Sequence, residues 1–382
     1  MGPEPARAEI VVDLAALRHN VRRLRELVGP GPAMMTVVKA DGYGHGMAGV
    51  ARAAREGGAD WLGVATVDEA VALRETGDSG PLLCWLGVPG EDYASAIRRD
   101  VEVTAYSIAE LGEIAAAADQ LGTTARVQLK VDTGLSRGGA ARADWAALFA
   151  AAAAAEAGER IRVTGVWSHF ACSDEPEHPA NDAQQKVFDE ALDVAAQAGL
   201  RPALRHLANS AGALLRPSAR YDLVRCGIAS YGLDPAPGRT RDLGLRPVMT
   251  VRARLAMVKR VRAGESVSYG HTWTADRDTT VGLVPVGYAE GVPRIGSNRV
   301  SVWAAGAPRP VRGRVCMDQF VIDLGDDTAV PGDEVVLFGA GPDGTPTATD
   351  WAQACETINY EIVTRMGGRL TRRTVDPERA TA

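Results

Sequence analysis

The sequence has few cysteines, and their spacing suits neither a disulfide framework nor a zinc site. Of 382 residues only five are cysteine, and they lie far apart without any Cys-x-x-Cys pair: Cys84, Cys172, Cys226, Cys316 and Cys355. Small secreted scaffolds and zinc sites both use closely spaced cysteines. We therefore expect free thiols in a reducing compartment, and no metal site.

Basic runs and long apolar runs are also missing. Lys and Arg total 42 against 48 Asp and Glu, so the chain offers no stripe of positive charge to a phosphate backbone. No apolar stretch is long enough to cross a bilayer, and the first nine residues lack the apolar segment of a secretory signal. We expect a cytoplasmic protein that binds neither nucleic acid nor membrane.

Lysine is scarce among the basic residues. Arginine supplies all but four of the 42 basic side chains. An arginine cannot lose its proton to act as a nucleophilic amine, whereas a lysine can. Most lysines in proteins are solvated surface charges, so each of the four must be judged by its context: Lys39, Lys130, Lys186 and Lys259.

The first two thirds of the chain show the pattern of repeated βα units. From Ala33 onward, short β-branched runs alternate with longer stretches rich in Ala, Leu, Glu and Arg, which is typical of a parallel sheet with helices around it. Eight strands favour a (β/α)8 TIM-type barrel, with an open doubly wound sheet as the alternative. The expected strands are residues 35–39, 61–65, 82–86, 102–106, 126–131, 162–169, 204–208 and 223–226, with helices at 67–74, 107–119, 144–157 and 182–198.

After about Leu245 the pattern changes to β-branched runs separated by Gly and Pro. This predicts a separate, mostly antiparallel β domain that ends in a helix over residues 349–366. The early segment 9–13 is β-like and is expected to pair with this later sheet. We expect a barrel over 11–242, a β domain of 1–10 and 243–376, and a tail over 377–382; the later strands are expected at 248–259, 280–285, 298–302, 319–323 and 334–338.

Polar side chains gather at the carboxyl ends of the predicted barrel strands, where barrel enzymes place their active residues. Lys39 follows an apolar strand and precedes a loop with three alternating glycines. A partly desolvated amine at a barrel rim favours its neutral form, and therefore Schiff-base chemistry. A strand-capping lysine beside a flexible turn is equally compatible with these residues alone. The other polar side chains at strand ends are Lys130, His169, Asn209, Ser210 and Arg225.

The ten residues 37–46, VVKADGYGHG, resemble the pyridoxal-phosphate attachment signature of the alanine racemases. The similarity runs along nearly the whole chain, from about Glu9 to about Arg369. It implies a fold-type-III enzyme that interconverts L- and D-alanine and supplies D-alanine for cell-wall peptidoglycan. In such an enzyme Lys39 carries pyridoxal 5′-phosphate covalently, and Tyr43 holds its phosphate.

Further motifs match at the expected barrel positions. The run KVDTGLSR, residues 130–137, resembles the segment with a carbamylated lysine, at Lys130, and a partner arginine, at Arg137, that approaches the cofactor ring and substrate. A carbamylated lysine is an anion that can orient a guanidinium. An unmodified Lys130 paired with Asp132 is the alternative.

Three more barrel segments match the family, WSHF at 167–170, HLANS at 206–210 and RCGI at 225–228. The resemblance places His169 against the cofactor ring, donating to Arg225, which faces the pyridine nitrogen. Many other pyridoxal enzymes use a carboxylate there, and an arginine leaves the ring nitrogen unprotonated. The phosphate ligands implied are Asn209, Ser210 and the backbone amides of Gly227 and Ile228, at a helix N-terminus.

Racemisation needs acid–base groups on both sides of the α-carbon, and Lys39 serves only one. The run VSYGHT, residues 267–272, resembles the family's second-base motif, with Tyr269 contributed by the partner subunit and His206 as its hydrogen-bond partner. The resemblance therefore implies a homodimer with shared active sites. Other implied contacts to substrate or phosphate are Tyr288, Met317 and Tyr360.

Three alternatives stay open at this point. One is a racemase of broader specificity, acting on serine or lysine, because a pocket discriminates only modestly against one methylene. Another is a fold-type-III amino-acid decarboxylase, against which Arg225 and Tyr269 argue. The third is a non-catalytic pyridoxal-phosphate carrier, which is a barrel alone and would not explain the β domain.

Overall fold

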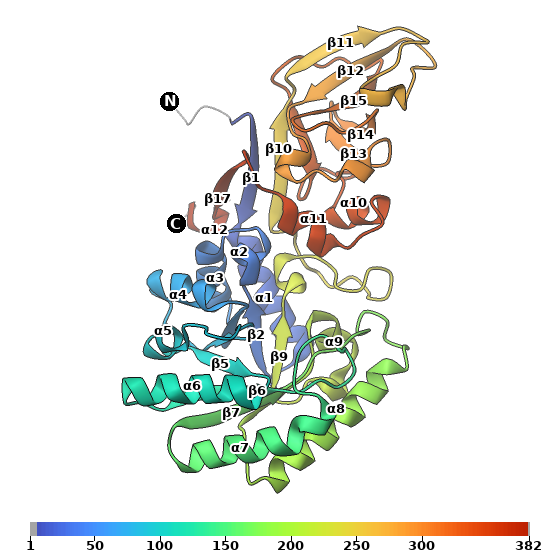
Figure 1. Cartoon of the computed structure of the whole chain (residues 1–382). Coiled ribbons are helices and arrows are strands. Elements are labelled where there is room, and N and C mark those ends of the chain that lie inside the picture. The colour runs from blue at the N-terminus through green and yellow to red at the C-terminus, as the bar shows by residue number, and fades with distance from the viewer. Residues whose placement is uncertain (1–5, 381–382) are drawn as a thin grey trace.

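The eight expected barrel strands form one parallel sheet in the computed structural model, which describes residues 6–380 (Figure 1). The first seven strands pair with one another in chain order, and the eighth pairs with the first. Backbone hydrogen bonds from Asp222 to Arg205 and from Arg225 to Ala208, both 3.0 Å, link the two ends of the sheet. The (β/α)8 barrel is confirmed, with strands β2 (Ala33–Val37), β3 (Trp61–Val64), β4 (Leu82–Cys84), β5 (Glu102–Ala105), β6 (Ala125–Lys130), β7 (Ile161–Trp167), β8 (Leu204–His206) and β9 (Leu223–Cys226).

Helices surround this barrel, and polar side chains cap several of them. Asp13 accepts the backbone N–H groups of Ala15 and Ala16 at the start of α1, and Thr66 and Glu69 form a capping box on α4. The alanine-rich stretch is a helix, α7, as its propensity predicts. The helices of this part are α1 (Leu14–Val28), α2 (Lys39–Tyr43), α3 (Met47–Glu56), α4 (Val67–Glu75), α5 (Tyr93–Arg98), α6 (Ile108–Leu121), α7 (Trp145–Ala157), α8 (Ala180–Gln197) and α9 (Ser210–Leu215).

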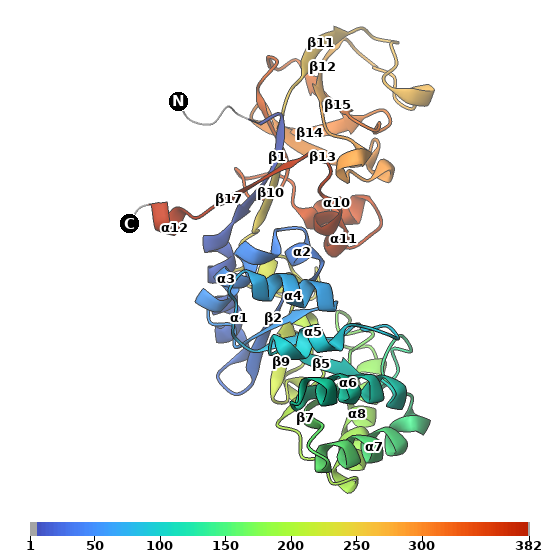
Figure 2. The ribbon, with the colours of Figure 1, turned by 60° about the vertical axis from the view of Figure 1, so that its left-hand side comes forward.

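A second, mostly antiparallel sheet forms the other part of the molecule (Figure 2). Strand β1 pairs antiparallel with β10 and parallel with β17, so segment 9–13 joins the later sheet as expected. In order across the sheet its strands are β11 (Met257–Val261), β12 (Thr279–Val284), β15 (Phe320–Gly325), β14 (Ala307–Arg312), β13 (Ser301–Ala304), β16 (Glu334–Phe338), β10 (Met249–Arg254), β1 (Ala8–Asp13) and β17 (Thr371–Val375).

Two expectations for this part were wrong. The single strand expected at 248–259 is divided into β10 and β11. The two strands pair with different neighbours, and the chain passes from one set of partners to the other at Leu255 and Ala256. The helix expected at 349–366 is two helices, α10 (Ala348–Ala354) and α11 (Asn359–Arg365). Between them Glu356 takes a left-handed φ of 56°, which ends α10.

The end of the chain packs beside the barrel. Residues 377–380, expected as a tail, form a short helix, α12 (Pro377–Ala380), while 381–382 and 1–5 lie outside the described residues. Arg18 of α1 pairs with Asp376, and Arg379 pairs with Glu56. Within residues 6–380, no helix is long and apolar enough to cross a membrane.

Candidate active site

A cavity of about 770 Å³ opens at the carboxyl ends of the barrel strands. Its size lies within the range of ligand pockets in proteins. Eleven residues that the sequence predicts for a cofactor or substrate site line this one cavity: Lys39, Tyr43, Lys130, Arg137, His169, Asn209, Ser210, Arg225, Gly227, Ile228 and Tyr360. All but Tyr360, which lies on α11, come from the barrel.

Lys39 begins a left-handed turn. From Ala40 to Gly44 every residue has a positive φ, between 52° and 80°. A left-handed conformation costs roughly 1–2 kcal/mol for each residue with a side chain, so the turn needs support from its surroundings. Backbone hydrogen bonds from Gly42 to Val38 and from Gly44 to Ala40, both 2.9 Å, hold it internally.

The amine of Lys39 lies in a partly apolar and electropositive setting. Its nitrogen is 5.8 Å from the centre of the Trp85 ring. Burial lowers the pKa of Lys39, the positive charge of Arg137 lowers it further, and Glu69 opposes both. The neutral, nucleophilic form is therefore more accessible than for a surface lysine.

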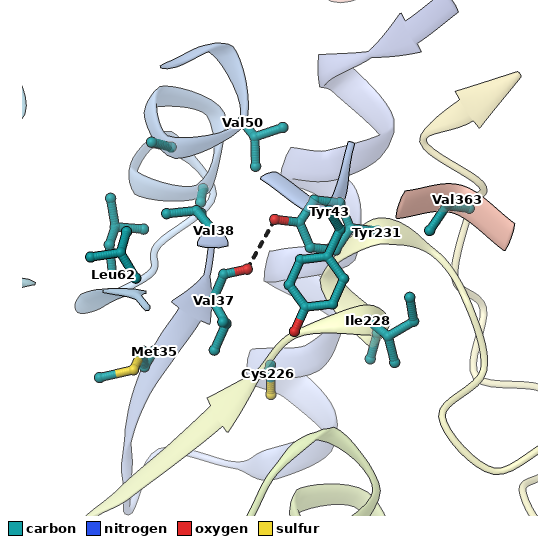
Figure 3. Packing of buried hydrophobic residues seen from close by; sticks show 14 of the residues in the cluster. Met35, Val37, Val38, Tyr43, Val50, Leu62, Cys226, Ile228, Tyr231 and Val363 are labelled. Carbon is teal, nitrogen blue, oxygen red and sulfur yellow. Dashed lines mark hydrogen bonds between the residues drawn. The ribbon is translucent and has the colours of Figure 1, made fainter. Parts of the chain in front are cut away.

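Tyr43, within this turn, packs against the ring of Tyr231. The rings of Tyr43 and Tyr231 lie 4.8 Å apart, and the Tyr231 hydroxyl donates to the carbonyl of Val37 at 2.9 Å (Figure 3). Burial raises the pKa of both phenols, so both remain donors. The Tyr43 hydroxyl lies so close to Gly227 that a Cβ there would be 2.4 Å away, which explains the glycine. Sequence reasoning did not find Tyr231.

Hydrogen-bond donors collect around Gly227. Its N–H donates to Ser210 Oγ at 2.9 Å, which leaves the Ser210 hydroxyl proton free to donate. Asn209 instead caps α9, where its Oδ1 accepts from Gly212 at 3.0 Å. Ile228 begins a short 3-10 helix, Ile228–Tyr231, where a helix N-terminus was expected after the last barrel strand. With the Tyr43 and Tyr360 hydroxyls, this corner has the donors that an anion such as phosphate requires.

Arg225 lies buried in the barrel and bonds to neutral acceptors. Its guanidinium donates to His206 Nδ1 at 2.8 Å and to His169 Nδ1 at 3.2 Å. It also donates to the carbonyls of Ser168 and Leu207. Within the described part of the chain no carboxylate pairs with it, and burial lowers the pKa of Arg225 to about 9. The direction expected for the His169 bond was wrong, because a guanidinium can only donate.

His206 has no ring nitrogen available for the contact expected with the partner subunit's Tyr269. His206 is completely buried, and both of its ring nitrogens are occupied, Nδ1 by Arg225 and Nε2 by Gln128 Oε1 at 2.7 Å. The ring also stacks on Trp167 with centres 5.4 Å apart. Of the two histidines bonded to Arg225, only His169 lines the cavity.

A chain of hydrogen bonds continues below His206. Gln128 donates to Glu102 at 2.8 Å, and Glu102 also accepts from Arg126 and Thr164. Because Gln128 Oε1 accepts, His206 carries its proton on Nε2 and accepts at Nδ1. Sequence reasoning missed this chain; polar residues within otherwise buried strands were the available signal.

Lys130 does not pair with Asp132. Its nitrogen lies over the rings of Trp167 and Tyr106, at 4.5 and 5.3 Å. The Asp132 carboxylate accepts backbone N–H groups of Gly134 and Ser136 instead. Burial lowers the pKa of Lys130 to about 8, and the charges of Arg225 and Arg137 act in the same direction. This cluster of cations favours an anion.

The remaining three predicted residues lie in the other part of the molecule. Tyr269, Met317 and Tyr288 are 72%, 53% and 41% exposed, and within the described chain none of them lines the barrel cavity. Their loops are joined, because the backbone N–H of Tyr288 donates to the carbonyl of Cys316, and Ser268 Oγ donates to that of Arg314. One chain therefore presents two separate groups of predicted site residues.

The buried histidines make stability depend on pH. Burial and Arg225 hold the pKa of His206 and His169 well below 6.5. The unfolded chain then binds more protons, so this stability is complete above about pH 6.5 and is lost as the pH falls. The unfolding free energy of the parent protein should therefore rise with pH between about pH 5 and 6.5. We expect His206→Asn to make this rise less steep by about 1.4 kcal/mol per pH unit. Urea unfolding of both proteins across this pH range measures the slope. Parallel plots of unfolding free energy against pH would contradict the prediction.

Comparison with known proteins agrees with this geometry. The family model for the alanine racemase N-terminal domain matches residues 12–235, and that for the C-terminal domain matches 248–374. The alanine racemase of Salinispora arenicola is 54% identical over 372 residues, 97% of this chain and 99% of that protein. That of Thermobifida fusca is 53% identical over 96% of this chain and 97% of its own length.

Solved structures show the same likeness. The crystal structure of the alanine racemase from Streptomyces lavendulae, a D-cycloserine producer, has a TM-score of 0.95 and 51% identity, covering 97% of each chain. The alanine racemase from Streptomyces coelicolor has a TM-score of 0.94 and 52% identity, over 97% of this chain and 98% of that chain. This chain belongs to the alanine racemase family.

Proposed function

We propose that this isomerase interconverts L- and D-alanine with pyridoxal 5′-phosphate bound covalently to Lys39, using Tyr269 of a second subunit as the opposing acid–base group. The observation that carries the proposal is that one cavity holds three features: a desolvated amine, Lys39, a group of hydrogen-bond donors around Gly227, and an arginine that pairs with no carboxylate of the described residues, Arg225. In this proposal residues 11–242 supply the cofactor site, and 1–10 with 243–376 supply the second base.

The cavity suits the cofactor at both of its ends. The donors around Gly227, with Ser210, Tyr43 and Tyr360 among them, would hold the phosphate, and Asn209 would support them as the cap of α9. Arg225 would donate to the pyridine nitrogen, and His169 would lie against the ring. Pyridoxal phosphate would supply an electron sink for an amino acid linked to it in place of Lys39, which would make the α-proton acidic and leave the Lys39 amine free.

The protein's own groups then move the proton. The Lys39 amine, with its pKa lowered by burial, can take a proton on one side of the α-carbon and return it. Tyr269 cannot act from within the same chain, because it is exposed on a loop outside the barrel cavity. A second copy that brings its Tyr269 to the opposite side would complete the site. His169, whose Nε2 has no hydrogen-bond partner within residues 6–380, would meet that hydroxyl.

The substrate carboxylate would bind to cations and to an amide. Arg137 lines the cavity beside Lys130, and the backbone amide of the partner subunit's Met317 would add a donor, with Tyr288 lining the access corridor. We also propose that Lys130 is carbamylated. The modification requires a neutral amine, which the lowered pKa provides, and it would convert one of several crowded cations into an anion that orients Arg137.

Lys130→Met is expected to raise the KM for alanine about tenfold, or about 1.4 kcal/mol, because Arg137 loses a charged hydrogen-bond partner. NMR after incubation with 13C-bicarbonate should show one carbamate carbon in the parent protein and none in the variant. Lys186→Met, on the exposed face of α8, is the matched control and should change neither result. An unchanged KM together with no carbamate signal would rule out the modification.

We propose alanine as the substrate, in place of serine or lysine, because the chain belongs to the alanine racemase family. The cavity geometry alone does not discriminate between small amino acids. A decarboxylase is disfavoured because Arg225 occupies the position where that group uses a carboxylate. The proposed cellular role is the supply of D-alanine for cell-wall peptidoglycan from the cytoplasm.

The test is to incubate the purified holoenzyme with L-alanine in deuterated water. We expect D-alanine to form with deuterium at the α-carbon, and little turnover of serine or lysine. Carbon dioxide release in place of D-alanine, or no turnover despite bound cofactor, would overturn the proposal.

A further inference from the structure

We propose that Arg372, on strand β17 near the end of the chain, is a positioning residue that holds the left-handed turn after Lys39 and thereby places its amine. The inference rests on the proposed function of Lys39 and concerns a residue more than three hundred positions away in the sequence. The guanidinium of Arg372 reaches the turn at two points, pairing with Asp41 at 2.8 Å and donating to the carbonyl of Gly44 at 3.0 Å.

The turn requires contacts of this kind because its backbone conformation is unfavourable. Ala40, Asp41 and Tyr43 have φ values of 52°, 52° and 54°, although each carries a side chain. Strain of this sort persists only where the surroundings impose it, and it is common at functional sites. The turn's own backbone bonds do not tie it to the rest of the protein.

Contacts from outside the turn come from two directions. On the barrel side, Glu69 of α4 accepts the N–H of Ala40 at 2.6 Å. On the other side, Arg372 holds Asp41 and Gly44, and its aliphatic arm covers Gly46, where a Cβ would lie 3.3 Å from Arg372 Cδ. Lys39 is therefore held between an acidic residue of the barrel and a basic residue of the second sheet.

Asp41 connects this contact to the following helix. One carboxylate oxygen accepts the N–H of Met47, at the start of α3, at 2.9 Å, and the other pairs with Arg372. One side chain of the turn thus connects it both to β17 and to α3. Loss of Arg372 would free the Gly44 carbonyl and one oxygen of Asp41 together.

Strand β17 is itself well anchored. It pairs in parallel with β1, with Ile10 opposite Arg372. Neighbouring side chains on a strand point to opposite faces, and the next residue, Arg373, pairs with Glu9 at 3.0 Å and takes no part in the cavity. Arg373 therefore provides a matched control: an arginine of the same strand, with a similar ion pair, that does not contact the turn.

The experiment compares Arg372→Ala with Arg373→Ala in the full-length protein. Hydrogen–deuterium exchange of the peptide covering residues 39–47 reports the turn directly. Borohydride reduction followed by mass spectrometry reports how fast pyridoxal phosphate reacts with Lys39. We expect Arg372→Ala to exchange about tenfold faster in this peptide, and to lower kcat by about 10–100-fold with a much smaller change in KM, because misplacing a reacting group by about 1 Å can cost that much.

Arg373→Ala should match the parent protein in all three measurements. Arg372→Lys should restore part of kcat, because an ammonium can pair with Asp41 but cannot also hold the Gly44 carbonyl in the same fork geometry. Equal effects of Arg372→Ala and Arg373→Ala, or parental protection of peptide 39–47 in Arg372→Ala, would overturn the proposal.

A second variant keeps the test decisive if Arg372→Ala does not fold. Asp41→Asn removes the ion pair but keeps an oxygen for Met47, and the Asp41 side chain is 55% exposed. Faster exchange in its 39–47 peptide supports the proposal, and parental exchange overturns it. The exchange measurement needs no cofactor and no turnover, so it judges Arg372 even if the parent protein fails to racemise alanine.

Discussion

Lys39→Ala is expected to lower kcat for alanine racemisation by at least about 10³-fold, because in the proposed mechanism one side chain supplies both the covalent attachment and one acid–base group. The cavity places no other lysine in an equivalent position. Lys130 lies over the Trp167 and Tyr106 rings, whereas Lys39 begins the turn beside Trp85. Chiral chromatography of alanine after incubation with excess pyridoxal phosphate measures the loss.

Two controls make the Lys39 result specific. Lys39→Arg keeps the positive charge but cannot form the covalent link, so it should be as inactive as Lys39→Ala. Lys186→Ala removes an exposed lysine and should leave kcat unchanged. If Lys39→Ala retained more than about a tenth of kcat, a loss of under about 1.4 kcal/mol, the assignment would be wrong.

Tyr269→Phe is expected to lower the racemisation rate by about 10²–10⁴-fold, the usual contribution of a positioned acid–base group. The substitution removes only a hydroxyl from a side chain that is 72% exposed in one chain, so stability should change little. Because Lys39 remains on its own side, the variant should still exchange the α-hydrogen of one enantiomer with deuterated water while forming little of the other.

That one-sided exchange distinguishes a lost base from a damaged site. NMR of L- and D-alanine incubated separately with the variant measures it. Tyr221→Phe removes a hydroxyl that bonds to Asp189 outside the cavity, and it should preserve both activities. Equal loss of exchange from both enantiomers in Tyr269→Phe would show that Tyr269 does not serve one side alone.

The barrel could be predicted because its strands are short, apolar and bounded by helices of clear period. Even β3, β4 and β5 appear within two residues of the expected bounds, since each is buried along almost its whole length. The cavity residues followed from the rule that barrel sites lie at carboxyl ends of strands, supported by the family resemblance. Residues as far apart as Lys39 and Arg225 were grouped correctly on this basis.

The second sheet was harder to predict because its pairing is long-range. Strand β17 is almost wholly exposed and rich in arginine, so its sequence shows no alternation of apolar and polar residues. It forms a strand because it pairs in parallel with β1. Strand β14 contains prolines at 308 and 310, which weaken any strand prediction. The break between α10 and α11 depends on one left-handed residue, Glu356. A glycine at this position would have indicated the end of a helix, whereas a glutamate does not.

Hydrogen-bond partners inside the barrel could not be predicted from the sequence either. The bond between His206 and Gln128 joins side chains of β8 and β6, two strands that lie on either side of β7 in the sheet. The role of Arg372 depends on a contact between two segments at opposite ends of the chain. Local patterns contain no information on either pairing.

The most direct test of a shared, two-sided active site is complementation between two inactive chains. Lys39→Ala and Tyr269→Phe chains, each with a different affinity tag, are mixed by unfolding and refolding, and dimers with both tags are isolated. Each such dimer would hold one site with an intact barrel and an intact partner tyrosine, so about half of the parental activity per dimer is expected. Activity no higher than that of the two separate variants would contradict the account.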